Sequence, residues 1–123
     1  MFKEMCLVFS LSNIREQDAS SPDATEILKM ATVGGARAMQ LKDCDVLAVG
    51  KCADLIMIDM HQPNMQPEND IVRNLVYSGS KQNVKLTMIN GKILYEDGKF
   101  DIGTDPETIY LEATKIKQKL GMP

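Results

Sequence analysis

The apolar positions of the first 21 residues predict one helix followed by a loop. Up to about Ser12 the apolar side chains occupy more than one face of a helix, so this helix needs cover on several sides. Residues 13–21 are mostly polar and predict a loop. The chain is therefore expected to begin with a helix onto which other elements pack.

A second helix is predicted to start at Pro22, where Asp23 and Glu26 form a pattern close to a capping box. Along it, small and apolar residues recur at spacings of four and three in one narrow stripe: Ile27, Ala31, Gly34, Ala38 and Leu41. Gly34 and Gly35 should each destabilise this helix by about 1 kcal/mol relative to alanine. We expect a neighbouring element to press against their backbone. The alternative is a loop that approaches a ligand, but no phosphate-loop spacing supports it.

The middle of the chain changes to short apolar runs. Residues 46–49 and 55–58 predict two β-strands, and Gly50-Lys51 between them predicts a turn. A connection containing two prolines follows, after which the apolar residues between 71 and 76 predict one or two helical turns.

A β-hairpin is the clearest local prediction. Residues 84–88 alternate between apolar and polar, and Asn90-Gly91 separates them from a second apolar run at residues 93–95. Asn-Gly between apolar runs favours a type I′ turn, because both residues tolerate a positive φ. Asp-Gly at residues 97–98 predicts a further turn.

The sequence Asp105-Pro106-Glu107 predicts the start of a C-terminal helix. One face of this helix is apolar, at Ile109, Ala113, Ile116 and Leu120. Three lysines near its C-terminal end are interpreted as a solvated face, favoured there by the helix dipole: Lys115, Lys117 and Lys119.

Composition and charge exclude several classes of function. The chain has 123 residues, of which 44% are hydrophobic and 25% charged, as in an ordinary globular domain, and its length allows one small domain. The net charge of −3 gives no reason to expect a nucleic-acid partner. The sequence contains no apolar run long enough to span a membrane. The first ten residues carry Glu4 and lack a signal-peptide cleavage pattern, so we expect a cytoplasmic location.

The residues that most often carry metal or thiol chemistry are few. Cys6, Cys44 and Cys52 are odd in number and widely spaced, so we interpret them as reduced and mostly buried rather than as a disulfide framework or a zinc site. His61 is the only histidine and lies among turn-forming residues, with nothing nearby to make it a metal ligand.

No catalytic motif is found. The sequence has no H-x-H, H-E-x-x-H, G-x-S-x-G or phosphate-loop pattern. Asp54 and Asp59 flank a predicted strand, but their spacing places them on opposite faces, which favours turn and strand-end carboxylates over an acid and base pair. The scattered methionines are interpreted as core fillers. We therefore assign no catalytic, cofactor-binding or metal-binding residue.

The order of four segments resembles the C-terminal part of an amidohydrolase-superfamily enzyme. These segments are residues 31–39, 50–59, 84–92 and 96–99. The branch most similar in appearance is the cytosolic deaminase and chlorohydrolase group, which includes S-adenosylhomocysteine/methylthioadenosine deaminases. The chain departs from the family pattern at Gln40, where the helix normally ends in glycine, and in residues 42–45.

The resemblance implies an α+β piece of a larger fold. Residues 1–45 would supply helices from the end of a (β/α)8 barrel, and residues 46–100 part of the small β-sandwich beside it, with the hairpin at residues 90–91. Residues 101–123 would form the C-terminal helix. Length agrees, because such a barrel alone takes about 250 residues.

The resemblance also implies a divalent metal, zinc or iron, for the full-length family, whose bound hydroxide attacks a C–N or C–Cl carbon. Its ligands are an H-x-H pair, two further histidines and an aspartate. All of them would lie before Met1, so none is carried over to this chain, and we expect the chain alone to be inactive and to bind no metal.

Three interpretations remain open. The chain is the C-terminal segment of a metal-dependent amidohydrolase, a non-catalytic structural or interaction module, or an independent enzyme with its own site. A piece of this kind leaves apolar helix faces and a sheet edge uncovered, so we expect a homo-oligomer that pairs through them.

Overall fold

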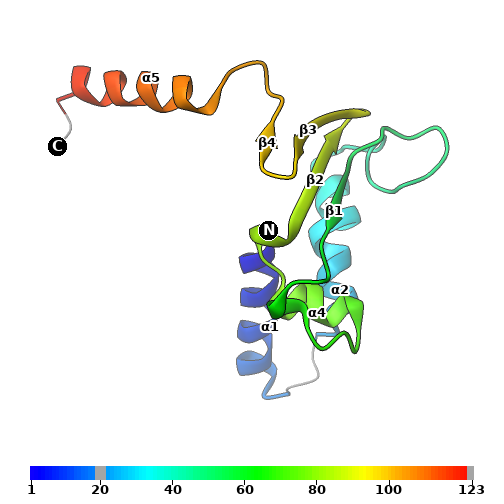
Figure 1. Ribbon diagram of the computed structural model, residues 1–123. Coiled ribbons are helices and arrows are strands. Elements are labelled where there is room, and N and C mark those ends of the chain that lie inside the picture. The colour runs from blue at the N-terminus through cyan, green and yellow to red at the C-terminus, as the bar shows by residue number, and fades with distance from the viewer. Residues whose placement is uncertain (19–21, 122–123) are drawn as a thin grey trace.

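The computed structural model describes residues 1–18 and 22–121, and nothing is said of the structure of the others. A helical layer and a four-stranded antiparallel sheet make up most of the described chain, and a C-terminal helix extends away from both (Figure 1). This mixture of helices and antiparallel sheet agrees with the expected α+β class.

The hydrophobic core lies among three helices: α1 (Phe2–Glu16), α2 (Ala24–Lys29) and α4 (Ile71–Ser78). Its buried members are Met5, Ala24, Ile27 and Val76, one or two from each helix. The predicted end of the first helix near Ser12 is wrong, because α1 continues to Glu16. Gln17 then takes a left-handed conformation with φ 54°, which ends the helix.

The second helix is interrupted by a wider turn. After α2, a π-helical turn (Met30–Gly34) leads into α3 (Gly35–Ala38). A Cβ at Gly34 would lie 3.1 Å from the Lys29 carbonyl oxygen of the preceding turn, and the atoms within 4 Å of a Cβ built at either glycine all belong to Lys29 or Met30, in the same run of helical turns. The expected pressure from a neighbouring element is therefore wrong for the described residues. The helix begins at Ala24, two residues after Pro22, and Asp23 caps it as the sequence indicates by accepting a hydrogen bond from the Thr25 N–H.

The end of α3 has the hydrogen bonds of a Schellman motif. The Leu41 N–H donates to the Ala36 carbonyl, and the Gln40 N–H donates to the Arg37 carbonyl. Gln40 has φ 61°, a conformation that glycine adopts without strain. The helix therefore stops where the resemblance expects it to, although glutamine replaces glycine there.

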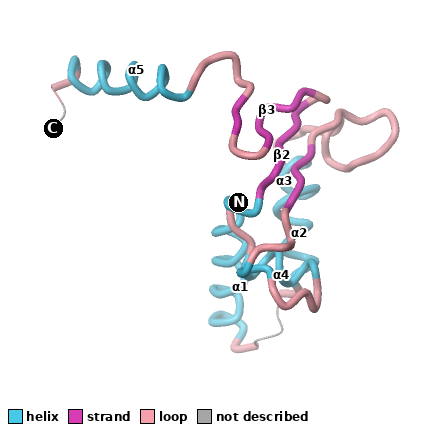
Figure 2. The backbone as a smooth tube through the Cα atoms, viewed as in Figure 1, coloured by secondary structure: helices cyan, strands magenta, loops and turns pink. Residues whose placement is uncertain are grey.

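The sheet consists of β1 (Leu55–Ile58), β2 (Val84–Ile89), β3 (Lys92–Glu96) and β4 (Lys99–Phe100) in that spatial order, so β1 lies at an edge. Neighbouring strands are antiparallel. Figure 2 shows the strands in magenta. The predicted hairpin is confirmed: Asn90 and Gly91 join β2 to β3 with φ 49° and 77°, as a type I′ turn requires. The turn at residues 97–98 is also confirmed.

The strand predicted at residues 46–49 is wrong, because this segment is a loop. Val46, Leu47 and Val49 are exposed, and Val49 is 107% exposed. Apolar composition alone does not make a strand when no other strand lies beside the segment to accept its backbone hydrogen bonds.

A buried asparagine joins the sheet to the loop that follows β1. Asn83 closes the 3₁₀ turn η3 (Lys81–Asn83) before β2 and is 0% exposed. Its Oδ1 accepts from the Ser80 N–H at 2.8 Å and from Asn64 Nδ2 at 2.9 Å. Its Nδ2 donates to Asn64 Oδ1 and to the Asp59 carbonyl. Asn64 lies in the 3₁₀ turn η2 (Pro63–Met65), so this one side chain connects three segments.

The C-terminal helix α5 (Pro106–Lys119) forms where the sequence predicts it, with Pro106 in its first turn. It stands apart from the helical layer and the sheet (Figure 1). Its apolar face is exposed, including Ile109, Ile116 and Leu120. The lysine face is exposed as predicted. In the described ranges no helix has both the length and the apolar character that crossing a membrane requires.

Candidate functional site

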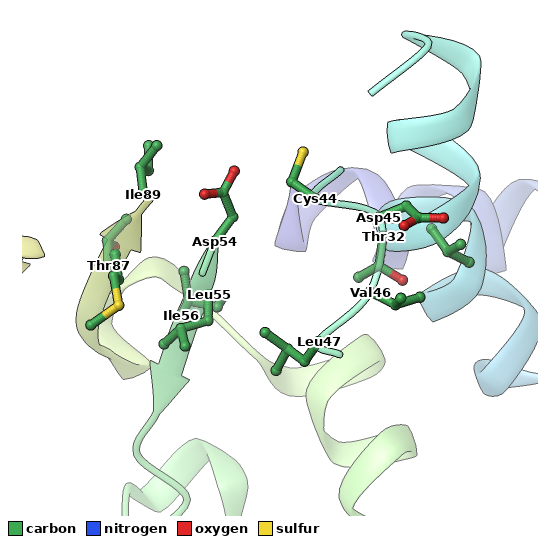
Figure 3. A pocket seen from close by; sticks show the side chains of 12 residues that line it. Thr32, Cys44, Asp45, Val46, Leu47, Asp54, Leu55, Ile56, Thr87 and Ile89 are labelled. Carbon is green, nitrogen blue, oxygen red and sulfur yellow. The ribbon is translucent and has the colours of Figure 1, made fainter. Parts of the chain in front are cut away.

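An open pocket of about 720 Å³ lies between the π-helical turn, the loop of residues 44–47 and the strands β1 and β2. Figure 3 shows side chains from these segments surrounding it. Most of its lining is apolar, from residues such as Leu47, Ile56 and Ile89. Its polar side chains are Thr32, Cys44, Asp45, Asp54 and Thr87. The pocket is therefore an apolar hollow with two carboxylates and one thiol at its wall.

Asp45 is held by two cations. The Lys51 Nζ lies 2.8 Å from Asp45 Oδ1, and the Arg37 Nε lies 3.6 Å from Oδ2. The hydrogen bond from Lys51, with the charges of Lys51 and Arg37, holds the pKa of Asp45 below its usual value. A carboxylate that stays ionised and paired in this way fixes the loop and is poorly suited to act as a general base.

Cys44 and Asp54 lie together at one end of the pocket, where both side chains project (Figure 3). Desolvation, followed by the charge of Asp54 and a hydrogen bond to it, raises the pKa of the Cys44 thiol. Asp54 Oδ1 also accepts a hydrogen bond of 2.6 Å from the Asn90 N–H of the hairpin turn. Asp54 therefore joins the start of β1 to the turn between β2 and β3.

Asp59, at the other end of β1, has a structural role of the same kind. It accepts hydrogen bonds from Gln62 Nε2 at 2.7 Å and from the His61 N–H at 2.9 Å, and Lys85 Nζ lies 3.8 Å away. The first two contacts, assisted by the Lys85 charge, lower the pKa of Asp59. The structure thus uses Asp54 and Asp59 as strand-end carboxylates, as the sequence indicates, and His61 is exposed.

The cysteines are only partly as expected. All three are free thiols, but Cys6 is exposed, and Cys44 and Cys52 are half-buried. The expectation that they are mostly buried is wrong, because Cys6 lies on the outer face of α1 and the other two lie at the base of an exposed loop. Among the methionines, Met5 and Met65 are buried core fillers as predicted, whereas Met30, Met39 and Met57 are exposed.

The residues that line the pocket do not form a metal site. Within residues 1–18 and 22–121, no group of three or more histidine, cysteine, aspartate or glutamate side chains is placed to hold a metal ion. Zinc needs three or four such ligands. The described residues therefore do not fit the divalent metal that the resemblance implies.

Sequence analysis missed this pocket. Its wall includes Val46 and Leu47, which the sequence predicts to lie in a strand, so the sequence does not predict the loop that faces β1. The charged residues around the apolar run could have indicated a loop closed by an ion pair, since Asp45 precedes the run and Lys51 follows it.

Comparison with known sequences gives consistent matches. The sequence profile of the amidohydrolase family matches residues 1–94. A 5-methylthioadenosine/S-adenosylhomocysteine deaminase from Caldanaerobacter subterraneus is 39% identical over 122 residues, which are 98% of this chain and 28% of that protein. One from Desulfovibrio desulfuricans is 41% identical over 117 residues, 95% of this chain and 26% of that protein. The chain therefore spans little more than a quarter of these relatives.

Solved structures also match nearly the whole of this chain and about a quarter of their own length. An adenosine deaminase from Xanthomonas campestris with bound zinc superposes with a TM-score of 0.89 and 28% identity, covering 97% of this chain and 27% of that protein. A triazine hydrolase variant gives a TM-score of 0.82 at 23% identity, covering 94% of this chain and 25% of that one, which shows the fold. The helices and sheet described above therefore occur together, in this arrangement, in larger enzymes.

Proposed function

Because this chain belongs to the amidohydrolase family, we propose that it is the C-terminal part of a metal-dependent hydrolase that deaminates a nucleoside or related heterocycle. One observation carries the proposal: 97% of the chain superposes, with a TM-score of 0.89, on 27% of an adenosine deaminase that holds zinc. The names of the relatives at 39% and 41% identity support deamination as the parent reaction.

In this proposal the described elements are structural parts of the larger enzyme. The helices within residues 1–45 are the terminal helices of the (β/α)8 barrel, and the sheet is part of the small β-sandwich beside it. The exposed apolar face of α5 and the apolar pocket at β1 support this placement, since both are surfaces that a larger protein would cover.

The catalytic metal is proposed to be bound by residues outside the described ones. Zinc or iron would supply a nucleophilic hydroxide in the parent enzyme. The described part of this chain contains no group of residues that fits the metal, so its proposed contribution is packing around the catalytic part.

A second candidate is a non-catalytic module that pairs with itself. The exposed apolar side chains of Leu47, Val49 and Ile56 near the free edge of the sheet favour it. Both candidates expect the isolated chain to pair with itself, so its oligomeric state does not separate them. The complementation assay does, because a non-catalytic module restores no deamination to the remainder of a related deaminase.

Complementation tests the proposed function. The gene for the Caldanaerobacter relative is cut so that the segment matching this chain is removed, and the remainder is produced together with the 123-residue chain. With zinc present, ammonia release from 5-methylthioadenosine, S-adenosylhomocysteine and adenosine is measured. We expect deamination when both pieces are present and none with either alone.

Two variants of this chain make the complementation specific. Ile27 is 1% exposed in the core, so Ile27→Asp should abolish complementation. Lys29, two residues further on, is exposed, so Lys29→Glu should retain it. Equal activity with the Ile27→Asp and unaltered chains, or no activity with any of them, would count against the proposal.

A further inference from the structure

The loop of residues 44–52 is closed at its base by several contacts. The Cys52 N–H donates to the Asp43 carbonyl at 2.7 Å. Lys51 Nζ lies 2.8 Å from Asp45 Oδ1 and also donates to the Lys42 carbonyl. The tip of the loop is exposed, and the contacts that hold its two ends together lie next to Cys44 and Cys52.

These contacts bring the two cysteines within reach of each other. Asp43 is bonded to Cys44, so its hydrogen bond to Cys52 places the two α-carbons within about 7 Å by bond lengths, close to the roughly 4.4–6.8 Å that disulfides span. Both thiols are free and half-buried, so reagents in solution can reach them. The third cysteine, Cys6, lies on α1, outside this loop.

The Cys44 thiol also lines the pocket. Desolvation and the charge of Asp54 raise the pKa of this thiol. Whichever of the two thiols meets the oxidant first, the other lies close enough to resolve the product.

We propose that Cys44 and Cys52 form a reversible disulfide that closes the loop of residues 44–52, with a low-molecular-weight disulfide such as oxidised glutathione as the oxidant. The thiolate of one cysteine attacks one sulfur of oxidised glutathione, which releases glutathione thiolate and forms a mixed disulfide. The other cysteine then attacks the protein sulfur of that mixed disulfide and releases the second glutathione thiolate. The two protein thiols lose two electrons and two protons, and oxidised glutathione gains them to give two molecules of reduced glutathione.

The disulfide changes the wall of the pocket. In the reduced chain, the Cys44 thiol lines the pocket together with Asp54, which accepts the Asn90 N–H. In the oxidised chain, the Cys44 sulfur is bonded to Cys52 and the pocket loses this thiol. Oxidation therefore fixes the loop and alters the polar end of the pocket that faces the sheet.

Thiol–disulfide exchange tests the proposal on the 123-residue chain with Cys6→Ser. The chain is equilibrated with mixtures of reduced and oxidised glutathione, once in native buffer and once in guanidinium chloride, and then alkylated. Trypsin cleaves after Lys42, Lys51 and Arg73, so the disulfide joins the peptides 43–51 and 52–73, which mass spectrometry identifies. The additional single variants Cys44→Ser and Cys52→Ser serve as matched controls.

The folded chain should form the disulfide with an equilibrium constant about tenfold or more above that of the denatured chain, because the fold holds the two thiols together. The single-cysteine variants should give only glutathione adducts. Equal constants in native buffer and in denaturant would overturn the proposal, as would glutathione adducts in place of the joined peptides.

Discussion

Replacing Asn83 by alanine is the sharpest test of how the sheet is joined to its loops. Asn83 is 0% exposed, and every buried polar side-chain atom among the described residues has a partner. Asn83→Ala removes the acceptor of the Ser80 N–H and the donor to the Asp59 carbonyl. A buried polar group left without a partner destabilises the folded state by about 1–3 kcal/mol.

The expected magnitude follows from which groups stay unpaired. Asn64 is exposed, so water can replace its lost contact, whereas Ser80 and Asp59 are half-buried. Leaving the Ser80 N–H and the Asp59 carbonyl unpaired together lowers the free energy of unfolding by about 2–3 kcal/mol. With a urea dependence of about 1.5 kcal/mol per molar, the unfolding midpoint falls by about 1.3–2 M.

Urea unfolding followed by far-ultraviolet circular dichroism measures the midpoint. Gln82→Ala is the matched control, because Gln82 is the exposed neighbour of Asn83 in the same 3₁₀ turn, and its side chain can be removed without unpairing a buried group. A loss smaller than about 0.5 kcal/mol for Asn83→Ala, or an equal loss for both variants, would refute the reasoning.

Four further outcomes are expected. Gln40→Gly should raise the unfolding free energy by up to about 1 kcal/mol, since it relieves the left-handed strain at φ 61°, and Gln40→Ala should give no gain. Asp45 and Asp59 have folded-state pKa values below their usual ones, so the stability that these carboxylates contribute is present above about pH 4 and is lost as pH falls through the lowered values. Asp45→Asn should therefore flatten the fall of the urea midpoint below about pH 4. An unchanged pH dependence would contradict this. A chelator should leave the thermal midpoint of the chain unchanged, because the described residues hold no group of metal ligands, and a clear drop would reveal one. Removal of residues 105–123 should change the unfolding free energy by less than about 0.5 kcal/mol, since α5 is almost wholly exposed, and a larger loss would mean that the helix packs on the rest of the chain.

The elements that the sequence predicted correctly are those set by local chemistry. Asn90-Gly91 specifies its turn through the positive φ values of two residues, whatever surrounds them. Pro106 starts α5 because its fixed φ suits the first turn of a helix. Neither prediction needs knowledge of distant contacts.

The elements predicted wrongly depend on partners that are distant in the sequence. Residues 46–49 have the composition of a strand but lie beside no other strand among the described residues. The stripe along the second helix is buried only at its first residue, Ile27, because α1 and α4 cover that end alone. Composition could not indicate which part of an apolar stripe would be covered.

The pocket could not be predicted from the sequence for the same reason. Its lining comes from the π-helical turn, the loop of residues 44–47 and two strands, which only the fold brings together. Sequence analysis identified Asp54 and Asp59 as strand-end carboxylates, since each lies next to a strand that the local pattern already marked. The pairing of Asp45 with Lys51 needed the loop to be recognised first.

The open edge of β1 can lead to aggregation when the chain is concentrated. Its four residues, Leu55–Ile58, are apolar, and the strand contains neither lysine nor proline to discourage pairing. Such an edge is a template onto which another chain can add as a fibril grows. Asp54 and Asp59, one on each side, act as electrostatic gatekeepers, so protonating them in acid is expected to shorten the lag time of amyloid formation.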